Sequence, residues 1–301
     1  MSGPPDTQVD GLVVVDKPAG MTSHDVVARC RRAFGQRRVG HGGTLDPDAT
    51  GVLLVGLGRA TRLLQWVSAL DKAYTCTVVL GVATTTLDAA GEVTGTWDMT
   101  GVTLDAARAA AATLTGSIEQ VPPMVSAVKV GGRRLHELAR QGVEVERAAR
   151  PVRVDRFAVD LRGPGSQPGT LELAASVVCS SGTYVRSLAA DLGAALGGGA
   201  HLTDLRRTRI GGFDVADATP LDDVGPDAVL PPAAAVGHLP PVTVAGPLAG
   251  AVGHGKVLER AALGATGPGP WAVHDAAGAL LAVYEAHGDG RAKPAVVLAA
   301  G

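Results

Sequence analysis

The sequence predicts an α+β fold over residues 11–220 and a small β-rich domain over residues 242–301. Two observations predict it. Strand-like and helix-like apolar patterns interleave in the first region, but without the regular strand–helix–strand repeat of a doubly wound sheet. From Val242 onward the apolar segments are short and strand-like only. Residues 221–241, rich in Pro, Ala and Asp, are predicted to form a linker, and the polar residues 1–10 a disordered leader.

Apolar alternation or short apolar runs predict the strands. In the first region these are Gly11–Asp16, Val52–Val55, Lys72–Leu80, Ser126–Val130, Pro151–Leu161, Thr170–Cys179 and His201–Ile210. In the last region they are Trp271–Val273, Leu280–Tyr284 and Ala295–Leu298.

Capping residues and helical spacing predict the helices. Thr22 and Asp25 have the spacing of a capping box, which opens a helix that Gly35 ends. Thr103 is expected to cap the helix predicted at Leu104–Leu114. The remaining helical ranges are Ala60–Leu70, Leu104–Leu114, Arg133–Gln141 and a helix opened by Ser181–Thr183 that runs through Leu196.

Charge is balanced overall but clustered along the chain. The net charge is −2, and residues 221–301 carry four basic and seven acidic residues. Elsewhere arginines group in three places, where they can neutralise phosphates if the fold brings them to one face. The groups are Arg29, Arg31, Arg32, Arg37 and Arg38; Arg147, Arg150, Arg153 and Arg156; and Arg206, Arg207 and Arg209.

Several classes of protein are excluded by absent patterns. No apolar run reaches the roughly 18 residues of a membrane span, and no secretion signal precedes the first strand. Three widely spaced cysteines without a Cys-x-x-Cys pair argue against a disulfide framework and a zinc site, and fit a reducing cytosol. Nucleotide-binding glycine motifs, metal-ligand triads and Ser-His-Asp spacing are also missing. The sequence therefore predicts a cytoplasmic protein that uses neither metal nor cofactor.

Residues 40–51 form the most distinctive stretch, with four glycines around one histidine and two aspartates. Pro47 fixes its own φ and moves Asp46 away from helical geometry. We therefore expect Asp46 on a rigid loop, where a carboxylate can act as nucleophile or base. His41, in the same stretch, can orient a substrate or contact a phosphate.

A second candidate group follows the strand that ends at Cys179. Arg186 is expected in the first turn of a helix, where a cation is badly placed for the helix dipole. Such a residue usually has a fixed carboxylate partner, and we predict that this partner is Asp46. The isolated Tyr74 is, on its own, more typical of a core position. Residues and spacing alone indicate an RNA- or nucleotide-handling enzyme or a binding module.

Taken together, these motifs resemble the TruB family of bacterial tRNA pseudouridine synthases over about residues 11–220. The motifs that carry the resemblance, in family order, are Val15–Ser23, Gly40–Pro47, Ala49–Leu53, Leu57–Arg62, Lys72–Tyr74, Gln120–Lys129, Gly182–Leu188 and Gly199–Arg207. The resemblance implies a central mixed, mainly antiparallel sheet flanked by helices, with a PUA-like C-terminal domain. It also implies an enzyme that acts on the T arm of tRNA and converts uridine 55 to pseudouridine by base flipping. We expect a monomer.

Residue roles follow from the same resemblance. Asp46 matches the catalytic aspartate, Tyr74 the tyrosine that stacks on the base, and Arg186 the arginine paired with the aspartate. The other matches are expected to contact the substrate: His41, Tyr184, Leu205, Lys17 and Lys129. Thr84–Thr86 departs from the family's Thr-Asp-Thr, and the acidic C-terminal region matches only loosely.

Two other functions remain open from the sequence. One is a tRNA-folding chaperone in which catalysis is dispensable. The other is a base-excising RNA glycosylase, which can also use one aspartate at a glycosidic bond. Whether Asp46 acts on C1′, on C6 of the ring or on the 2′ proton also stays open.

Overall fold

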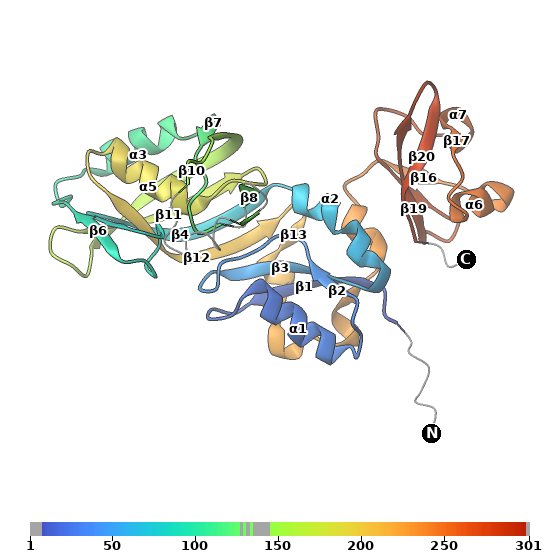
Figure 1. Cartoon of the computed structure of the whole chain (residues 1–301), viewed down its shortest axis with the longest axis horizontal. Helices are drawn as coiled ribbons and strands as arrows, with labels where there is room; N and C mark the ends of the chain where they lie inside the picture. The colour runs from blue at the N-terminus through green and yellow to red at the C-terminus, as the bar shows by residue number, and fades with distance from the viewer. Residues whose placement is uncertain (1–7, 127–128, 131–132, 135–144, 299–301) are drawn as a thin grey trace. The chain divides into compact units, whose positions relative to one another are not determined.

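The computed structural model describes residues 8–126, 129–130, 133–134 and 145–298 (Figure 1). The chain divides into two compact units. Unit 1 comprises residues 1–47, 53–68 and 217–301, and unit 2 comprises residues 48–52 and 69–216. The strand β3 (Thr50–Leu57) crosses the boundary, so its first residues belong to unit 2 and the rest to unit 1. In the described part of the chain no helix is long and apolar enough to cross a bilayer.

Unit 1 begins with a buried strand, β1 (Gly11–Lys17), next to β3 in the sheet order. A short strand, β2 (Val39–His41), pairs antiparallel with β3. The helix α1 (Ser23–Ala33) packs its Val26, Val27 and Cys30 into the core that these strands form. The predicted capping box is confirmed, because the Thr22 side chain accepts from the Asp25 backbone N–H and the Asp25 side chain accepts from that of Thr22.

The predicted linker turns out to be part of this core. In the range 221–241, Leu221 and Val224 are buried with the β1 and β3 side chains. Strand β14 (Thr219–Pro220) pairs parallel with β1, and β15 (Val229–Leu230) pairs antiparallel with it. The prolines of this range favour the 3-10 turns that separate these short strands. A composition rich in Pro, Ala and Asp thus forms a packed, irregular segment here and not a linker.

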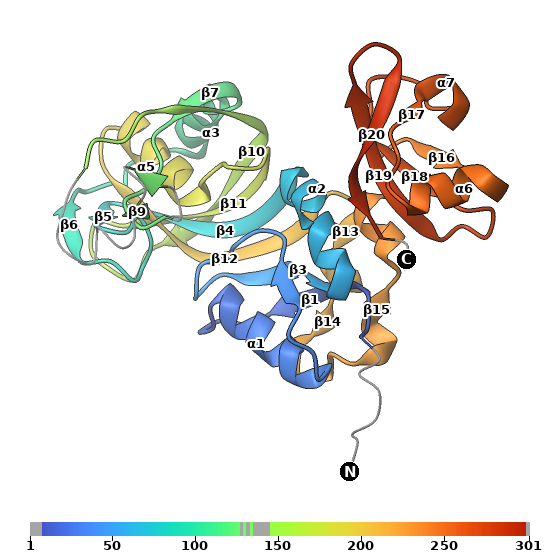
Figure 2. The same cartoon turned by 45° about the vertical axis from the view of Figure 1, so that its right-hand side comes forward.

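The C-terminal part of unit 1 is a five-stranded sheet, seen from two sides in Figures 1 and 2. Its order is β16 (Pro241–Thr243), β18 (Trp271–His274), β19 (Leu280–His287), β20 (Arg291–Val297) and β17 (Leu258–Glu259). Its core is built around Trp271 and Tyr284, both fully buried. The expected β-rich domain is confirmed, but the expectation of strands only is wrong, since α6 (Gly246–Gly253) and α7 (Arg260–Leu263) are short helices.

Unit 2 is built on an antiparallel sheet that follows β3. Its order is β12 (Ala200–Ile210), β4 (Lys72–Leu80), β11 (Leu171–Cys179), β10 (Arg150–Pro164) and β7 (Gly116–Gln120). The start of β3 pairs parallel with β12, which makes the sheet mixed but mainly antiparallel, as predicted. Two helices, α3 (Leu104–Thr113) and α5 (Val185–Ala195), pack against β10 and β12 (Figure 1). The Thr103 cap is confirmed.

Smaller elements complete unit 2. The hairpin β5 (Val82–Thr84) and β6 (Val93–Thr96) follows β4, and β13 (Phe213–Asp214) extends β12. In unit 1, the 3-10 helix η1 (Gly58–Leu63) and the helix α2 (Leu64–Ala69), whose last residue falls in unit 2, replace the single helix predicted at Ala60–Leu70. Of the predicted helix Arg133–Gln141, residues 133–134 form β9, paired with β8 (Lys129–Val130), and 135–141 lie outside the described residues.

Candidate active site

The loop that carries Asp46 connects β2 to β3 and is held at three points of unit 1. At its start, the Gly42 N–H donates to the Leu54 carbonyl at 2.8 Å. Just before the aspartate, the Leu45 N–H donates to Ser23 Oγ at 2.9 Å, and that hydroxyl donates to the Leu45 carbonyl at 3.2 Å. Leu45 itself is buried. Asp46 therefore sits, half-buried, on a loop whose backbone is fixed on both sides.

Lys17 provides the third point. Its side chain is fully buried, and its Nζ donates to the Pro18 and Pro47 carbonyls, each at 2.8 Å. A buried ammonium needs such acceptors, because burial without them costs several kcal/mol. Lys17 was expected to contact substrate. The structure gives it bonds to the backbone next to Asp46, the geometry of a positioning residue, and its contact with substrate stays a prediction.

His41 lies at the end of β2, half-buried. Its ring meets that of His24, in the first turn of α1, edge to face with 5.2 Å between ring centroids. His41 thus belongs to the surroundings of the Asp46 loop in unit 1, as its place in the sequence suggested.

Tyr74 lies in β4 of unit 2 with a side chain that is 8 % exposed. Its direct neighbours are Val177 in β11 and Arg207 in β12. Arg207 is buried, and its Nε donates to the Val52 carbonyl at 2.7 Å. Because its guanidinium is committed to the interior, Arg207 does not form part of a surface for phosphates. The third arginine group of the sequence is therefore not one exposed cluster.

Arg186 is the second residue of α5, as predicted, and is 4 % exposed. Its Nη1 donates to the Thr86 carbonyl at 2.9 Å, and its Nη2 donates to the Val125 carbonyl at 2.8 Å. Nη1 also lies 3.4 Å from Asp88 Oδ2. A buried guanidinium in this position needs a carboxylate, and unit 2 supplies one that the sequence reasoning missed.

Asp88 is held in turn by the threonines of its own loop. Thr84 Oγ1 donates to the Asp88 carbonyl at 2.7 Å, and Thr86 Oγ1 donates to its Oδ1. This loop is the one in which Thr84–Thr86 departs from the family pattern. An aspartate two residues after those threonines was the available signal. The predicted pair between Arg186 and Asp46 joins the two units and stays a prediction.

The first turn of α5 is anchored by a glutamine. Tyr184 N–H donates to Gln120 Oε1 at 2.8 Å, and Gln120 Nε2 donates to the Tyr184 carbonyl at 3.1 Å. Since α5 has no side-chain cap of its own, this paired amide takes over the capping role. Gln120 is buried and is the last residue of β7. The strand therefore fixes the position of the N-terminal end of α5, where Tyr184 and Arg186 lie.

The two remaining candidates lie on strands of unit 2. Leu205 is half-buried in β12, where the pairing register with β4 shifts between Thr203 and Arg206. Asp204, just before it, has a positive φ of 53°. This irregularity turns Leu205 out of the regular ladder. Lys129 lies in β8, and its side chain is outside the described residues.

Lys72 is a further titratable group on β4 that the sequence reasoning did not single out. Burial, followed by the nearby Arg207 guanidinium, lowers the pKa of Lys72 from 10.5 to about 8. Its Nζ donates to the Leu70 carbonyl at 2.7 Å. A positive charge that the fold disfavours in this way costs stability wherever the lysine is protonated.

Lys72→Met is therefore expected to give a stability difference that depends on pH. Above about pH 8 the native chain releases this proton, while the unfolded chain holds it up to about pH 10.5. The wild-type protein thus regains up to ~3 kcal/mol relative to the variant as the pH rises through this window. Urea unfolding of both proteins between pH 7 and 10.5 measures this change, with Lys256→Met at an exposed lysine as control. A difference for Lys72→Met that stays constant over the window would contradict the assignment.

The described residues hold no group of three His, Cys, Asp or Glu side chains that can bind a metal ion. The three cysteines are free and buried. Burial raises the pKa of the Cys30 and Cys179 thiols to about 11 and that of Cys76 to about 12. These thiols are protonated and act as apolar core groups.

Comparison with known proteins places the chain in a family. The sequence model described as "TruB family pseudouridylate synthase (N terminal domain)" matches residues 31–185. The model described as "tRNA pseudouridylate synthase B C-terminal domain" matches residues 186–230. The chain belongs to the TruB family.

Relatives named tRNA pseudouridine synthase B support this membership. The protein of Mycobacterium ulcerans (strain Agy99) is 47 % identical over 96 % of this chain and 94 % of its own. That of Mycobacterium sp. (strain KMS) is 57 % identical over 70 % of this chain and 71 % of its own.

Solved structures with the same fold are complexes that contain Cbf5. A Cbf5–Nop10–Gar1 complex matches with a TM-score of 0.69 and 28 % identity, over 97 % of this chain and 84 % of the matched chain. An archaeal box H/ACA Nop10–Cbf5 complex matches with a TM-score of 0.69 and 26 % identity, over 99 % and 90 %. The predicted pseudouridine synthase fold is thereby confirmed for this TruB member.

Proposed function

We propose that this TruB family member isomerises uridine to pseudouridine at position 55 in the T loop of tRNA, with Asp46 as its catalytic residue. The observation that carries the proposal is the Asp46 loop itself. Ser23 and Lys17 bind the backbone on either side of a half-buried aspartate, at Leu45 and Pro47. A carboxylate held in this way is preorganised for a reaction at a bound nucleotide.

The reaction is balanced without any added group. The C1′–N1 bond of the uridine breaks, the base turns, and a C1′–C5 bond forms. C5 then loses its proton and N1 gains one. One carboxylate and one acid–base group suffice, and Asp46 and Tyr74 are proposed for these roles. The target uridine must leave its stack, which costs a few kcal/mol. Stacking on Tyr74, worth about 1–3 kcal/mol, offsets part of this.

Digestion of treated T-arm RNA followed by nucleoside chromatography tests the proposal against its two alternatives. A synthase produces pseudouridine at one position and releases no base. A glycosylase releases free uracil and leaves an abasic site. A chaperone produces neither, and only accelerates the folding of tRNA. Formation of uracil, or of no product with fully folded protein and substrate, would overturn the proposed activity.

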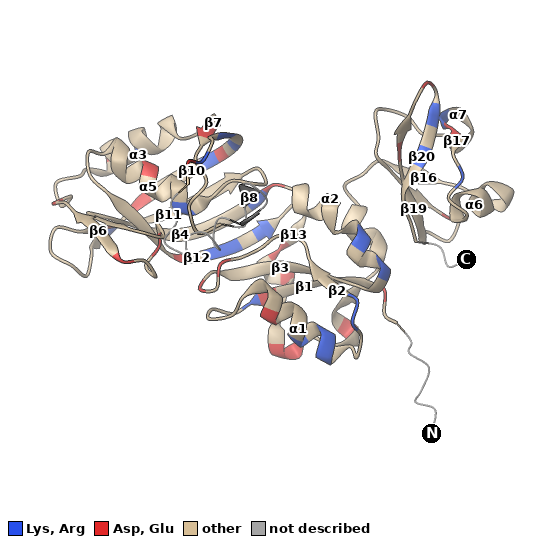
Figure 3. Ribbon diagram, viewed as in Figure 1, with Lys and Arg blue, Asp and Glu red and all other residues tan. Residues whose placement is uncertain are grey.

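The exposed arginines of unit 1 are proposed to contact phosphates of the RNA. Figure 3 shows basic residues on α1 and around η1. Arg32 and Arg37 are exposed, and the ion pairs found among the described residues include neither of them. Arg29, by contrast, is paired with Asp222.

Replacing both Arg32 and Arg37 by Ala is expected to weaken tRNA binding and to make that binding less dependent on salt concentration. Each lost phosphate contact reduces the slope of log K against log salt by about 0.9. Binding isotherms at several salt concentrations measure the slope. Arg29→Ala is the matched control and is expected to change it less, because Asp222 already neutralises that charge. An unchanged slope in the double variant would exclude this surface from the RNA interface.

A further inference from the structure

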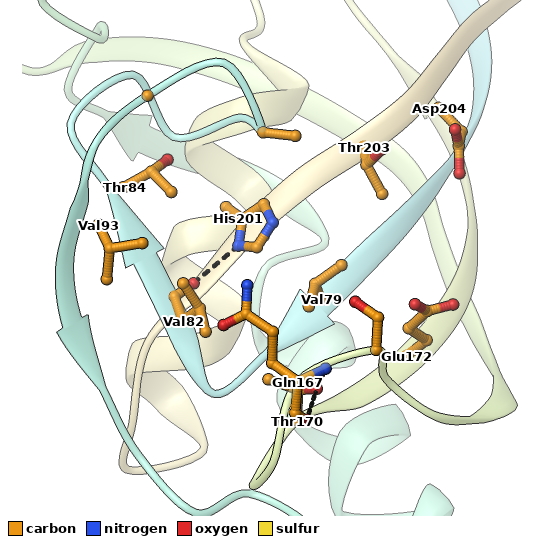
Figure 4. A pocket seen from close by; sticks show the side chains of 13 residues that line it. Val79, Val82, Thr84, Val93, Gln167, Thr170, Glu172, His201, Thr203 and Asp204 are labelled. Atoms are coloured by element: carbon orange, nitrogen blue, oxygen red, sulfur yellow. Dashed lines mark hydrogen bonds between the residues drawn. The ribbon is translucent and has the colours of Figure 1, made fainter.

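A cavity in unit 2 is lined by residues of β4, β5, β6, β11 and β12 and of the loops between them. Its volume is about 390 Å³, at the lower end of the range typical of small-molecule sites. Figure 4 shows its polar lining, which includes Glu172, His201, Thr203, Asp204 and Gln167. None of the groups proposed for catalysis lines it.

The floor of this cavity is the face of the sheet opposite to Tyr74. Val79 is paired directly with Glu172 on one side and with His201 on the other. Directly paired residues share a face, and successive residues of a strand alternate between faces. Because Tyr74 and Val79 are five positions apart in β4, their side chains point to opposite faces. The cavity is thus separate from the proposed catalytic tyrosine.

His201 indicates what this cavity can bind. Its side chain is 9 % exposed, and Nδ1 lies 2.9 Å from the Val82 carbonyl (Figure 4). A carbonyl only accepts, so Nδ1 carries a proton, and in the tautomer protonated at Nδ1 alone Nε2 is an acceptor. No hydrogen bond to Nε2 is found within the described part of the chain. The ring therefore offers a buried, unused acceptor to the cavity that it lines.

The other polar groups also favour a cationic donor. Glu172 is half-buried and belongs to none of the ion pairs found among the described residues. Asp204 accepts from Thr77 Oγ1 at 3.1 Å and lies 3.8 Å from Arg162 Nη1, which neutralises it only in part. Among the described residues, no lysine or arginine lines the cavity. The cavity thus presents one carboxylate outside the ion pairs found, one that Arg162 neutralises in part, and an imidazole acceptor.

The spacing of these groups favours an extended ligand over a metal ion. Glu172 and His201 are separated by two strand spacings, about 10 Å between their Cα atoms, with the apolar Val79 between them. The described residues form no group of three side chains that could hold a metal. We propose that this cavity binds a linear aliphatic polyamine, with one ammonium at Glu172, methylene groups over Val79, and a second ammonium at His201 Nε2.

Isothermal titration of the RNA-free full-length protein with spermidine tests this proposal. We expect saturable binding at one site, and binding at least about tenfold weaker for n-butylamine, which has a single ammonium. Glu172→Gln removes the charge but keeps the shape, and is expected to weaken spermidine binding at least about tenfold. Glu119→Gln, at an exposed glutamate of β7, is the matched control and should bind as the wild type does.

Three outcomes would overturn the proposal: no saturable binding of spermidine, equal binding by wild type and Glu172→Gln, or equal binding of spermidine and n-butylamine. A titration with Mg²⁺ alone distinguishes polyamine binding from a general affinity for cations. Tight Mg²⁺ binding that Glu172→Gln abolishes would also contradict the polyamine proposal. Thermal unfolding of each variant checks that the fold is intact. The Asp46→Asn variant should bind spermidine normally, so failure of the proposed catalysis and failure of this site are told apart.

Discussion

Asp46→Asn is expected to lower the rate of pseudouridine formation by about 10⁴-fold or more, while tRNA binding stays within about twofold. The amide keeps the shape of the carboxylate but can neither attack carbon nor accept a proton, and loss of such a group typically costs this much. The backbone bonds at Leu45 and Pro47 that hold the loop are kept in the variant, so the loop should keep its conformation. Single-turnover assays with nucleoside chromatography, and filter binding of tRNA, measure the two quantities.

Asp48→Asn is the matched control for this experiment. Asp48 lies on the same loop, two residues further on, and is exposed. Its replacement should leave the rate nearly unchanged. If Asp46→Asn retained more than about a hundredth of the wild-type rate, or if both variants lost activity equally, Asp46 would not be the catalytic carboxylate.

Arg186→Lys is expected to have the second-largest effect, a loss of about 10²-fold in rate and ~2–4 kcal/mol in stability. The guanidinium reaches the Thr86 and Val125 carbonyls and Asp88 from one buried position. A lysine ammonium is a point donor without the planar fork and cannot satisfy these acceptors together. Urea unfolding and single-turnover rates measure the two losses.

Arg153→Lys provides the comparison at the surface. Arg153 also contacts two carboxylates, Asp71 and Asp155, but it is half exposed, and exposed pairs contribute little. Its replacement should change neither stability nor rate by much. A double-mutant cycle with Asp46→Asn and Arg186→Lys then tests the predicted pairing, since additive effects would mean that the two residues act independently.

Local signals allowed much of the fold to be predicted. The capping box at Thr22 and the cap at Thr103 depend only on residues three positions apart, and both are present in the structure. The strand Lys72–Leu80 was predicted with its actual bounds, because apolar alternation is strong there. These features are fixed by neighbouring residues, and a sequence therefore contains all the information about them.

Features that depend on distant contacts were missed. Residues 221–241 were predicted as a linker because their prolines and alanines carry no periodicity, yet β15 in this range and β14 just before it are completed by hydrogen bonds to β1. Two helices of the C-terminal domain, α6 and α7, were missed for a similar reason. They are only 8 and 4 residues long, too short to show a helical apolar period.

In the candidate site too, locally determined residues could be predicted from the sequence and residues that depend on distant contacts could not. Asp46 could be singled out because a glycine-rich stretch and a proline surround it. Ser23 could not, because its bonds to Leu45 connect residues 22 positions apart. Asp88 is 98 residues from its partner Arg186, and only the tertiary structure brings the two together. Sequence patterns thus found residues with unusual local backbones and missed those that support them.

The three anchors of the Asp46 loop determine which partner must change shape when a complex forms. A loop already tied to Leu54, Ser23 and Lys17 loses little conformational entropy on binding. For the proposed reaction, the energetic burden of reaching the reactive geometry then falls on the nucleic acid, which must unstack and extrude one nucleotide. An RNA whose loop opens easily should accordingly be a better substrate than one held in a continuous stack, regardless of the bases on either side.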